Sequence, residues 1–281
     1  MSLHDAGTYW PPRPGGAGRL AVLFAVLLCS SALQAQEDSA TALAKKTQNP
    51  VADLISVPFQ NNFNFGVGPD EDVQYILNIQ PVYPMHLSEE WNLIHRPIIP
   101  LINQPSLAPA LDGQFGIGDL QYQTFFSPAK PGKLIWGAGP VLQFPTASGD
   151  VLGSGKWSVG PGLVALTAQG PWVAGALINN IWSFAGEGDR ADVNQMTLQP
   201  FVNYNLTHGW ALGTSPIITT DWKAGSGNRW TVPVGGGVQK IWHLGRLPVN
   251  TQLQAYWNAE HPESGADWQL RFQFALLFPK R

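Results

Sequence analysis

Apolar and polar residues alternate along this chain with a period of two. In the last apolar run, WQLRFQFALLF, large apolar side chains occupy every second position from Trp268 to Phe278. Gln269, Arg271 and Gln273 stand between the first of them. Because successive side chains of a β-strand point to opposite faces, the pattern predicts a strand with one apolar face and one mostly polar face.

The same alternation continues from Ile55 to the end of the chain, and helical spacing is not sustained. Most of the predicted strands have about ten residues or more, which is enough to cross a bilayer at a tilt. Strands of soluble sheets are more often about 5–6 residues long. The twelve predicted strands are 57–66, 73–83, 90–99, 117–127, 134–144, 157–169, 171–184, 194–205, 209–222, 230–242, 247–257 and 267–278.

The connections between these strands alternate in length. MHLSEE, SPAKPGK, AQGP, LTHG and HLGRLP are short or turn-like, whereas the intervening connections, such as LINQPSLAPALDGQ and PTASGDVLGSGK, are longer. Outer-membrane barrels have short periplasmic turns and longer external loops. A soluble sandwich, whose apolar faces would point inwards, gives no reason for this alternation. We therefore predict an all-β fold, a transmembrane antiparallel β-barrel of about 12 strands of the Gram-negative outer-membrane type.

Tryptophan positions give an independent indication of a membrane barrel. Nearly all Trp residues after residue 35 lie near the end of a predicted strand. Aromatic rings with a polar atom prefer the lipid headgroup region, so membrane barrels carry two aromatic girdles, whereas Trp in a soluble core would lie mid-strand. The expected periplasmic girdle is Trp91, Trp136, Trp172, Trp210 and Trp242, and the external one is Trp157, Trp182, Trp222, Trp230, Trp257 and Trp268.

Five prolines interrupt the predicted strands. Proline lacks the N–H that a β-ladder needs, and within sheets it is normally confined to edges and bulges. Our hypothesis is that these prolines mark bulges or kinks that bend the barrel wall. They are Pro140, Pro161, Pro200, Pro216 and Pro233.

Composition and the N-terminus fit a secreted membrane protein. Charged residues make up 12% of the chain, which is about half the usual share, and the mean hydropathy is close to zero. Basic residues, the apolar run LAVLFAVLLCSSALQAQ and small residues follow one another as in a secretory signal. We predict a signal peptide at 1–35, a flexible periplasmic segment at 36–54 and a β-barrel at 55–281. Because Cys29 is the only cysteine, the mature chain would contain none.

Short glycine-rich motifs in a fixed order resemble those of a known family. They are Gly118-Asp119-Leu120, Pro145-Thr146-Ala147, Gly153-Ser154-Gly155-Lys156-Trp157, Gly160-Pro161 and the ending Phe278-Pro279-Lys280. By these motifs the chain resembles, over about residues 50–281, the bacterial outer-membrane proteins grouped under the MetA pathway of phenol degradation. The resemblance implies a transporter-like β-barrel in the outer membrane. Many such barrels end on an aromatic residue, whereas Pro-Lys-Arg follows Phe278 here.

The polar face of the predicted strands is rich in amides and poor in charges. Charged side chains inside a membrane protein usually face a cavity and pair, so Arg96, Asp221 and Arg271 either line a solute path or form an ion pair that plugs the barrel. The predicted pore-lining residues are Arg96, Gln121, Gln123, Gln143, Asn179, Gln199, Asp221, Gln239, Arg271 and Gln273. The predicted external-loop residues are Asp150 and Lys156.

Three functions are compatible with such a barrel. Twelve strands enclose a lumen that is wider than a filled eight-stranded barrel and narrower than a porin, so we expect a channel for passive passage of a small solute. The family label points to a hydrophobic or aromatic solute. The alternative is a closed structural or surface-binding barrel that acts through external loops at 100–116 and 145–156. A lipid-modifying enzyme comes third, because no histidine lies beside a convincing serine on one strand face.

The sequence predicts no catalytic, cofactor-binding or metal-binding residues. GSGK lacks the spacing of a phosphate-binding loop, and strand periodicity rather than a helix follows it. A net charge of −3 gives no indication of a nucleic-acid partner. The expected partners are outer-membrane lipid and a small-molecule solute, and the sequence leaves the oligomeric state open.

Overall fold

The computed structural model of the chain describes residues 39–108 and 112–279. The predicted signal peptide lies outside these residues. In the described ranges, no helix is long and apolar enough to cross a membrane. Residues from Ala40 onwards fold as one unit.

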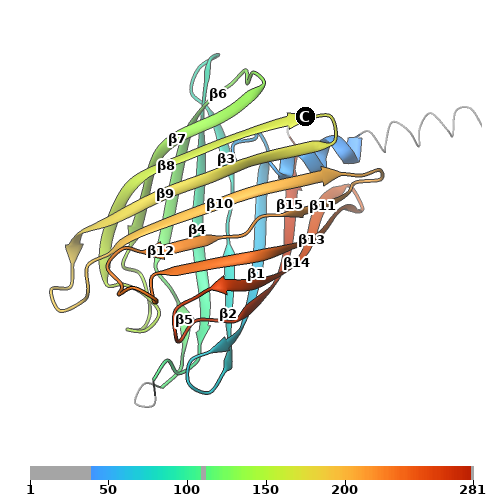
Figure 1. The fold of residues 1–281 in the computed structure, drawn as a ribbon. Coiled ribbons are helices and arrows are strands. Elements are labelled where there is room, and N and C mark those ends of the chain that lie inside the picture. Colours follow the sequence, from blue (N-terminus) through green and yellow to red (C-terminus); the bar gives the residue numbers. More distant parts are fainter. Residues whose placement is uncertain (1–38, 109–111, 280–281) are drawn as a thin grey trace, which may run out of the picture. The chain divides into compact units, whose positions relative to one another are not determined.

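This unit is a closed antiparallel barrel of twelve strands, as the sequence predicts (Figure 1). Nine barrel strands are continuous and three are each interrupted once. The continuous strands are β1 (Ile55–Val67), β4 (Trp91–Gln104), β7 (Leu134–Phe144), β8 (Lys156–Gln169), β9 (Trp172–Gly186), β10 (Asn194–Asn205), β13 (Trp230–Leu244), β14 (Leu247–Glu260) and β15 (Trp268–Phe278). The interrupted strands are β2 (Asp72–Ile79) with β3 (Tyr83–His86), β5 (Gln114–Ile117) with β6 (Leu120–Pro128), and β11 (Trp210–Thr214) with β12 (Ile218–Asp221).

The first and last strands close the barrel. β1 and β15 pair in one unbroken antiparallel register, from Ile55 opposite Phe278 to Phe65 opposite Trp268. We call the end of the barrel that holds Ile55 and Phe278 the terminal rim, and the other end the opposite rim. Closure leaves no strand edge in the wall, which is the requirement for a sheet in lipid.

One predicted loop is shorter than the sequence analysis expects. β4 continues to Gln104, and β5 pairs with this extension, so the prediction of a loop over 100–116 is wrong and the connection spans 105–113. Pro100 does not end β4, because its carbonyl still accepts a hydrogen bond from the Gly118 N–H at 2.9 Å.

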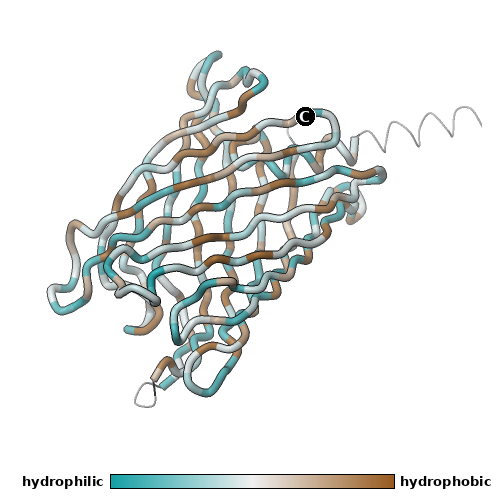
Figure 2. Tube along the Cα trace, in the orientation of Figure 1, coloured by the Kyte–Doolittle hydropathy of each residue, from teal (hydrophilic) through white to brown (hydrophobic). Residues whose placement is uncertain are grey.

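The apolar face of the strands points outwards. In β15, Arg271 has 2% of its surface exposed, whereas its neighbour Phe272 has 41% exposed. Phe184 and Val234 are likewise exposed on the outside of β9 and β13. Figure 2 shows apolar residues spread along the strands around the barrel wall. A soluble protein would bury these side chains, so the exterior is that of a protein surrounded by lipid.

Aromatic side chains pair at both ends of the barrel wall. The pairs at the terminal rim are Trp91 with Trp136 and Trp172 with Tyr204. The pairs at the opposite rim are Phe65 with Trp268, Phe144 with Trp157, and Trp222 with Trp230. At the terminal rim the Lys240 ammonium lies 4.5 Å from the centre of the Trp210 ring. This arrangement is that of two aromatic girdles.

The five strand prolines disturb the ladder in two ways. At Pro233 the pairing of β13 with β14 shifts register, so this proline lies at a bulge, as the hypothesis expects. Pro200 of β10 and Pro216, between β11 and β12, lie where the pairing of β10 with this interrupted strand stops. The β10–β11 and β10–β12 pairs on either side have the same register. Pro140 and Pro161 stand opposite each other in the regular β7–β8 ladder, and the pairs on their other sides are missing. Four of the five therefore interrupt hydrogen bonding without a bulge.

Gly160 precedes Pro161 in the stretch of β8 that has no ladder pairs with β9, and it lies very close to the β9 backbone. A Cβ atom at Gly160 would lie 1.7 Å from the Asn180 backbone oxygen of β9. We expect Gly160→Ala to lower the free energy of unfolding by about 1–3 kcal/mol, because the strands must move apart. The temperature at which the folded form converts to the unfolded form on an electrophoresis gel measures this. Gly188→Ala is the control, since a Cβ there meets nothing within 4 Å, and equal transition temperatures for both variants would contradict the expectation.

Candidate functional site in the barrel lumen

The segment before β1 folds into the barrel at the terminal rim. Residues 39–47 form a helix, and the chain then turns back towards β1. Val51 packs against apolar side chains that β4, β6, β8, β9 and β10 point inwards, and Ala44 and Leu54 pack against Ile241 and Leu277. We call residues 39–54 the plug segment. The sequence predicts a flexible segment over 36–54, whereas the described part of this segment is packed inside the barrel.

Polar contacts hold the plug segment to the wall. Gln48 and Asn205 exchange two side-chain hydrogen bonds, of 2.9 and 3.0 Å. The Lys45 ammonium donates to the Gly170 carbonyl at 2.7 Å. Both partners lie at the terminal rim, in β10 and in the turn between β8 and β9. The plug segment therefore narrows this end of the lumen.

The lumen has one apolar side and one polar side. Ile94, Phe125, Val164, Leu177 and Phe201 are buried on the inner face of the wall around Val51. The amide-rich interior that the sequence predicts is found mainly on the other side, on β1, β2, β13, β14 and β15. The apolar side chains pack against the plug segment, and the polar side remains partly open.

A cavity of about 140 Å³ lies between the plug segment and the polar side of the lumen. Three of its lining residues carry a charge, and all three are basic. No Asp or Glu among residues 39–108 and 112–279 lines it. The charged lining residues are Lys46, Arg96 and Arg271.

A chain of amides joins the two arginines. Arg96 Nη2 donates to Gln80 Oε1 at 3.2 Å, and Gln80 Nε2 donates to Gln60 Oε1 at 3.4 Å. Gln60 Nε2 donates to Asn62 Oδ1 at 3.1 Å. Arg271 Nε donates to the same Asn62 oxygen at 3.2 Å. The chain thus has a guanidinium donor at each end.

A second amide chain leads from Arg271 towards the opposite rim. Arg271 Nη2 donates to Gln269 Oε1 at 2.9 Å, and Gln269 Nε2 donates to Asn64 Oδ1 at 2.7 Å. Asn64 Nδ2 donates to Gln74 Oε1 at 2.7 Å, and Gln74 donates to Gln104. The chain crosses β15, β1, β2 and β4, so side-chain hydrogen bonds connect these strands in addition to the backbone hydrogen bonds of the ladders.

The proline interruption in the β11–β12 strand completes the environment of Arg271. Ser215 lies next to Pro216 in the unpaired stretch, and its carbonyl accepts a hydrogen bond from Arg271 Nη1 at 2.9 Å. The Ser215 N–H donates to Tyr256 Oη at 3.0 Å. β13 lies between these strands but has only glycine at 235–237, so no side chain of β13 separates Ser215 from β14 and β15.

The predicted pore-lining residues fall into three groups. Those that line the cavity are Arg96, Gln199, Gln239, Arg271 and Gln273. Those that lie on the inner face outside the cavity are Gln121, Gln123, Gln143 and Asn179. Asp221 lies at the opposite rim, where its carboxylate accepts a hydrogen bond from the Lys223 N–H at 2.9 Å. The ion pair that the sequence analysis considered between Asp221 and the arginines is therefore not formed.

Some residues of this site were missed from the sequence. Gln60 and Asn62 alternate with outward residues in β1, and this alternation in FQNNFNF could have identified them. Lys46 and Ser215 carry no such pattern, because neither lies within a regular strand.

Asp119 organises the loop at 145–155 that carries much of the family resemblance. Its carboxylate accepts hydrogen bonds from Ser154 N at 2.7 Å and Ser154 Oγ at 2.8 Å. It also accepts from Ala147 N at 3.2 Å and Gln143 Nε2 at 3.3 Å. The motifs around these residues therefore build one folded loop at the opposite rim.

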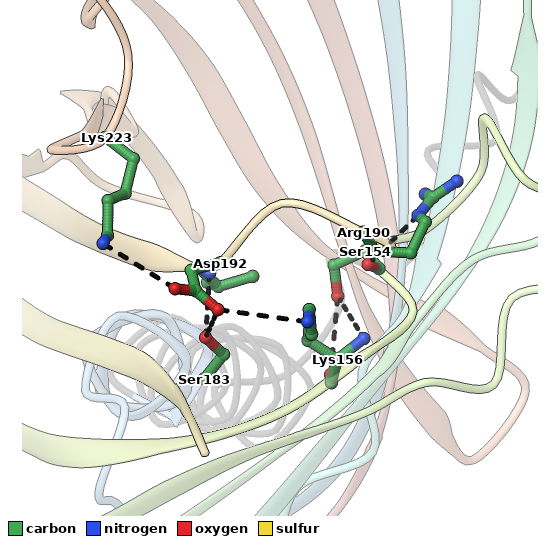
Figure 3. A network of polar contacts seen from close by, with 7 residues as sticks. Ser154, Lys156, Ser183, Arg190, Asp192 and Lys223 are labelled. Atoms are coloured by element: carbon green, nitrogen blue, oxygen red, sulfur yellow. Dashed lines mark hydrogen bonds and ion pairs between the residues drawn. The ribbon is translucent and has the colours of Figure 1, made fainter. Parts of the chain in front are cut away.

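A network of polar contacts lies beside this loop at the opposite rim (Figure 3). It includes Ser154, Lys156, Ser183, Arg190, Asp192 and Lys223. Arg190 donates to the carbonyls of Asp150 and Ser154, two residues of this loop. Lys156 is not a loop residue, contrary to the prediction. It is the first residue of β8, its side chain is buried on the inner face, and its ammonium lies 3.9 Å from Asp192.

The described histidines show no catalytic arrangement. His95 lies on the outer face of β4, and its Nδ1 lies 2.6 Å from the Tyr122 hydroxyl rather than beside a serine. Among residues 39–108 and 112–279, no group of three or more His, Cys, Asp and Glu side chains could hold a metal ion.

The fold is similar to solved outer-membrane channels. An outer membrane channel from Pseudomonas putida F1 matches with a TM-score of 0.59 and 16% identity, over 80% of this chain and 94% of that chain. The NanC porin matches with a TM-score of 0.52 and 9% identity, over 80% of this chain and 100% of that chain. A scan against protein-family models finds no match, and neither does a comparison with curated proteins.

We expect Asp119→Ala to loosen the loop at 145–155. The substitution removes the acceptor of the Ser154 N–H, and hydrogen bonds to a charged group contribute about 1.5–3 kcal/mol each, so this amide should exchange with solvent roughly tenfold faster or more. Hydrogen exchange on peptides from the folded barrel measures this. Asp150→Ala is the control in the same loop, because Asp150 contacts Arg190 through its backbone carbonyl. Unchanged exchange at Ser154 would contradict the role of Asp119.

Proposed function

We propose that this protein is an outer-membrane channel that lets a small solute pass by diffusion. The observation that carries the proposal is the polar cavity inside a closed barrel whose outer face is apolar. The similarity of the fold to an outer membrane channel and a porin supports it. The route to the membrane is the predicted signal peptide, and the terminal rim then faces the periplasm.

The solute path runs along the polar side of the lumen. The apolar side is packed against Val51, so the open space lies between the plug segment and the residues of β1, β4, β13, β14 and β15 that line the cavity. Such a path admits small solutes and excludes large ones. The resemblance to proteins of phenol degradation makes a hydrophobic or aromatic body the solute that we favour.

A closed barrel with a structural or surface-binding role is the second candidate. The packed plug segment favours it, because it fills part of the lumen, and the ordered loop at 145–155 offers a defined surface for binding. The histidine geometry gives no support to the third candidate, a lipid-modifying enzyme.

Single-channel recording in a planar bilayer separates the two main candidates. The purified, folded protein should give discrete conductance steps, and vesicles that contain it should take up small aromatic solutes. A folded protein that gives neither conductance nor uptake would leave the closed barrel as the better assignment.

We expect Val51→Asp to raise the single-channel conductance several-fold. The added carboxylate would lie among apolar side chains without a partner, which disfavours the packed position of the plug segment. Ala42→Asp is the matched control, because it adds the same charge at an exposed position of the same segment. Equal conductance for the two variants would show that the plug segment does not limit the path.

A further inference from the structure

The cavity holds positive charge that the described residues do not balance. Arg96 lies on β4 and Arg271 lies on β15, so β1 and β2 stand between them in the wall. Both arginines line the cavity. Within the part of the chain that the structure describes, no carboxylate forms an ion pair with either guanidinium. Their hydrogen-bond partners are neutral side-chain amides and one backbone carbonyl, from Gln80, Asn62, Gln269 and Ser215.

Such an arrangement favours an anionic occupant. A buried charge is costly unless it is paired, and charged side chains inside membrane proteins usually face a cavity and pair there. A guanidinium carries five N–H donors, and the hydrogen bonds of Arg96 to the chain use one of its terminal nitrogens. Its other N–H donors make no hydrogen bond within the part of the chain that the structure describes, so they are available to a ligand in the cavity.

Two other lining residues have buried polar atoms without a partner. Gln239 is 4% exposed, and its Nε2 donor has no hydrogen-bond partner among the described residues. Asn250 is equally buried, and its Oδ1 acceptor also lacks one. Buried polar atoms are nearly always satisfied, so the Nε2 donor of Gln239 favours a ligand that carries an acceptor, and Asn250 Oδ1 leaves room for a water molecule beside it.

The cavity also has an apolar wall and a limited size. Leu54, Val82 and Phe201 contribute apolar surface to its lining. Its volume of about 140 Å³ is close to that of an engineered protein cavity of ~150 Å³ that binds benzene. A ring-sized apolar body therefore fits beside the charged groups.

We propose that the cavity is a binding site for a small organic carboxylate with a body of about the size of a benzene ring. Arg96 holds the carboxylate, because its planar guanidinium matches the two oxygens; Arg271 adds positive charge to the same cavity, and Gln239 offers a further donor. Phe201, Leu54 and Val82 contact the ring. This inference rests on the proposed channel function and names the class of solute that the channel would favour.

Binding to the full-length protein in detergent tests the site without any need for conductance. Benzoate is the probe, and benzamide, which has the same ring without the charge, is the matched control ligand. Calorimetric titration should show binding of benzoate and much weaker binding of benzamide. Equal binding of the two, or no binding of benzoate, would overturn the proposal.

Single substitutions connect this binding to the arginines. Arg96→Gln should weaken benzoate binding roughly tenfold to a hundredfold, as expected for the loss of a charged hydrogen-bond donor. Arg246→Gln is the control, because Arg246 is exposed in the turn between β13 and β14. If Arg246→Gln weakens benzoate binding as much as Arg96→Gln, the loss comes from the removal of any positive charge and not from the cavity, and the proposal fails.

A second variant covers the case in which an arginine substitution prevents folding. Gln239→Glu changes the charge but not the shape of a cavity side chain, and it supplies an internal counter-charge to the arginines. It should abolish benzoate binding in a barrel that is at least as heat-resistant as the wild type. Gln121→Glu is its control, because Gln121 lies on the inner face outside the cavity. Retained benzoate binding in Gln239→Glu would contradict the site.

Ion selectivity in bilayers separates this inference from the proposed function. In a KCl gradient, the reversal potential of the wild type should show preference for anions, and Gln239→Glu should reduce it. A protein that conducts without preference for anions and does not bind benzoate would retain the channel function and lose the anion site. A protein that binds benzoate but does not conduct would lose the channel function and retain the site.

Discussion

Every backbone N–H and C=O in the membrane must find a partner within the protein, and the rest of this structure depends on that constraint. The pairing of β1 with β15 satisfies it by leaving no open edge. The unpaired stretch beside Pro216 is one of the interruptions of the ladder, and there the Ser215 N–H and C=O bond to Tyr256 and Arg271 instead. An interruption of the ladder thus becomes part of the polar network in the lumen.

The inner face of the wall has two different functions in the fold. Its apolar side, around Phe125 and Ile94, packs against Val51 and so positions the plug segment. Its polar side keeps two arginines in a network of amides, and the cavity lies in front of them. Because the plug segment leaves a cavity in front of the amides of the polar side, one barrel can be packed and still retain a polar space.

The sequence was sufficient to predict the barrel. The alternation at residues such as Arg271 and Phe272 gives each strand two unlike faces, and the connection lengths and tryptophan positions indicate that the apolar face meets lipid. It did not predict the plug segment, because that segment is short and has no sustained period. Val51 packs against apolar side chains of the inner wall, and these contacts cannot be seen in the sequence. It placed Lys156 in a loop and ended β4 too early, because glycine-rich and proline-containing stretches look like loops until their pairing is seen. It joined Asp221 to the arginines by strand face alone, since strand alternation gives the face of a residue but not its depth along the barrel axis.

The contacts of Arg271 link its position to the course of folding. Its side chain bonds to Asn62 of the first strand and to Ser215, which are 209 and 56 residues away along the chain. Contacts between residues so distant in sequence form late, because long loops must close first. The guanidinium therefore acquires all its partners only when the last strand has joined the first. An incompletely assembled barrel would lack the site, so affinity for a ligand in the cavity would also report that assembly is complete.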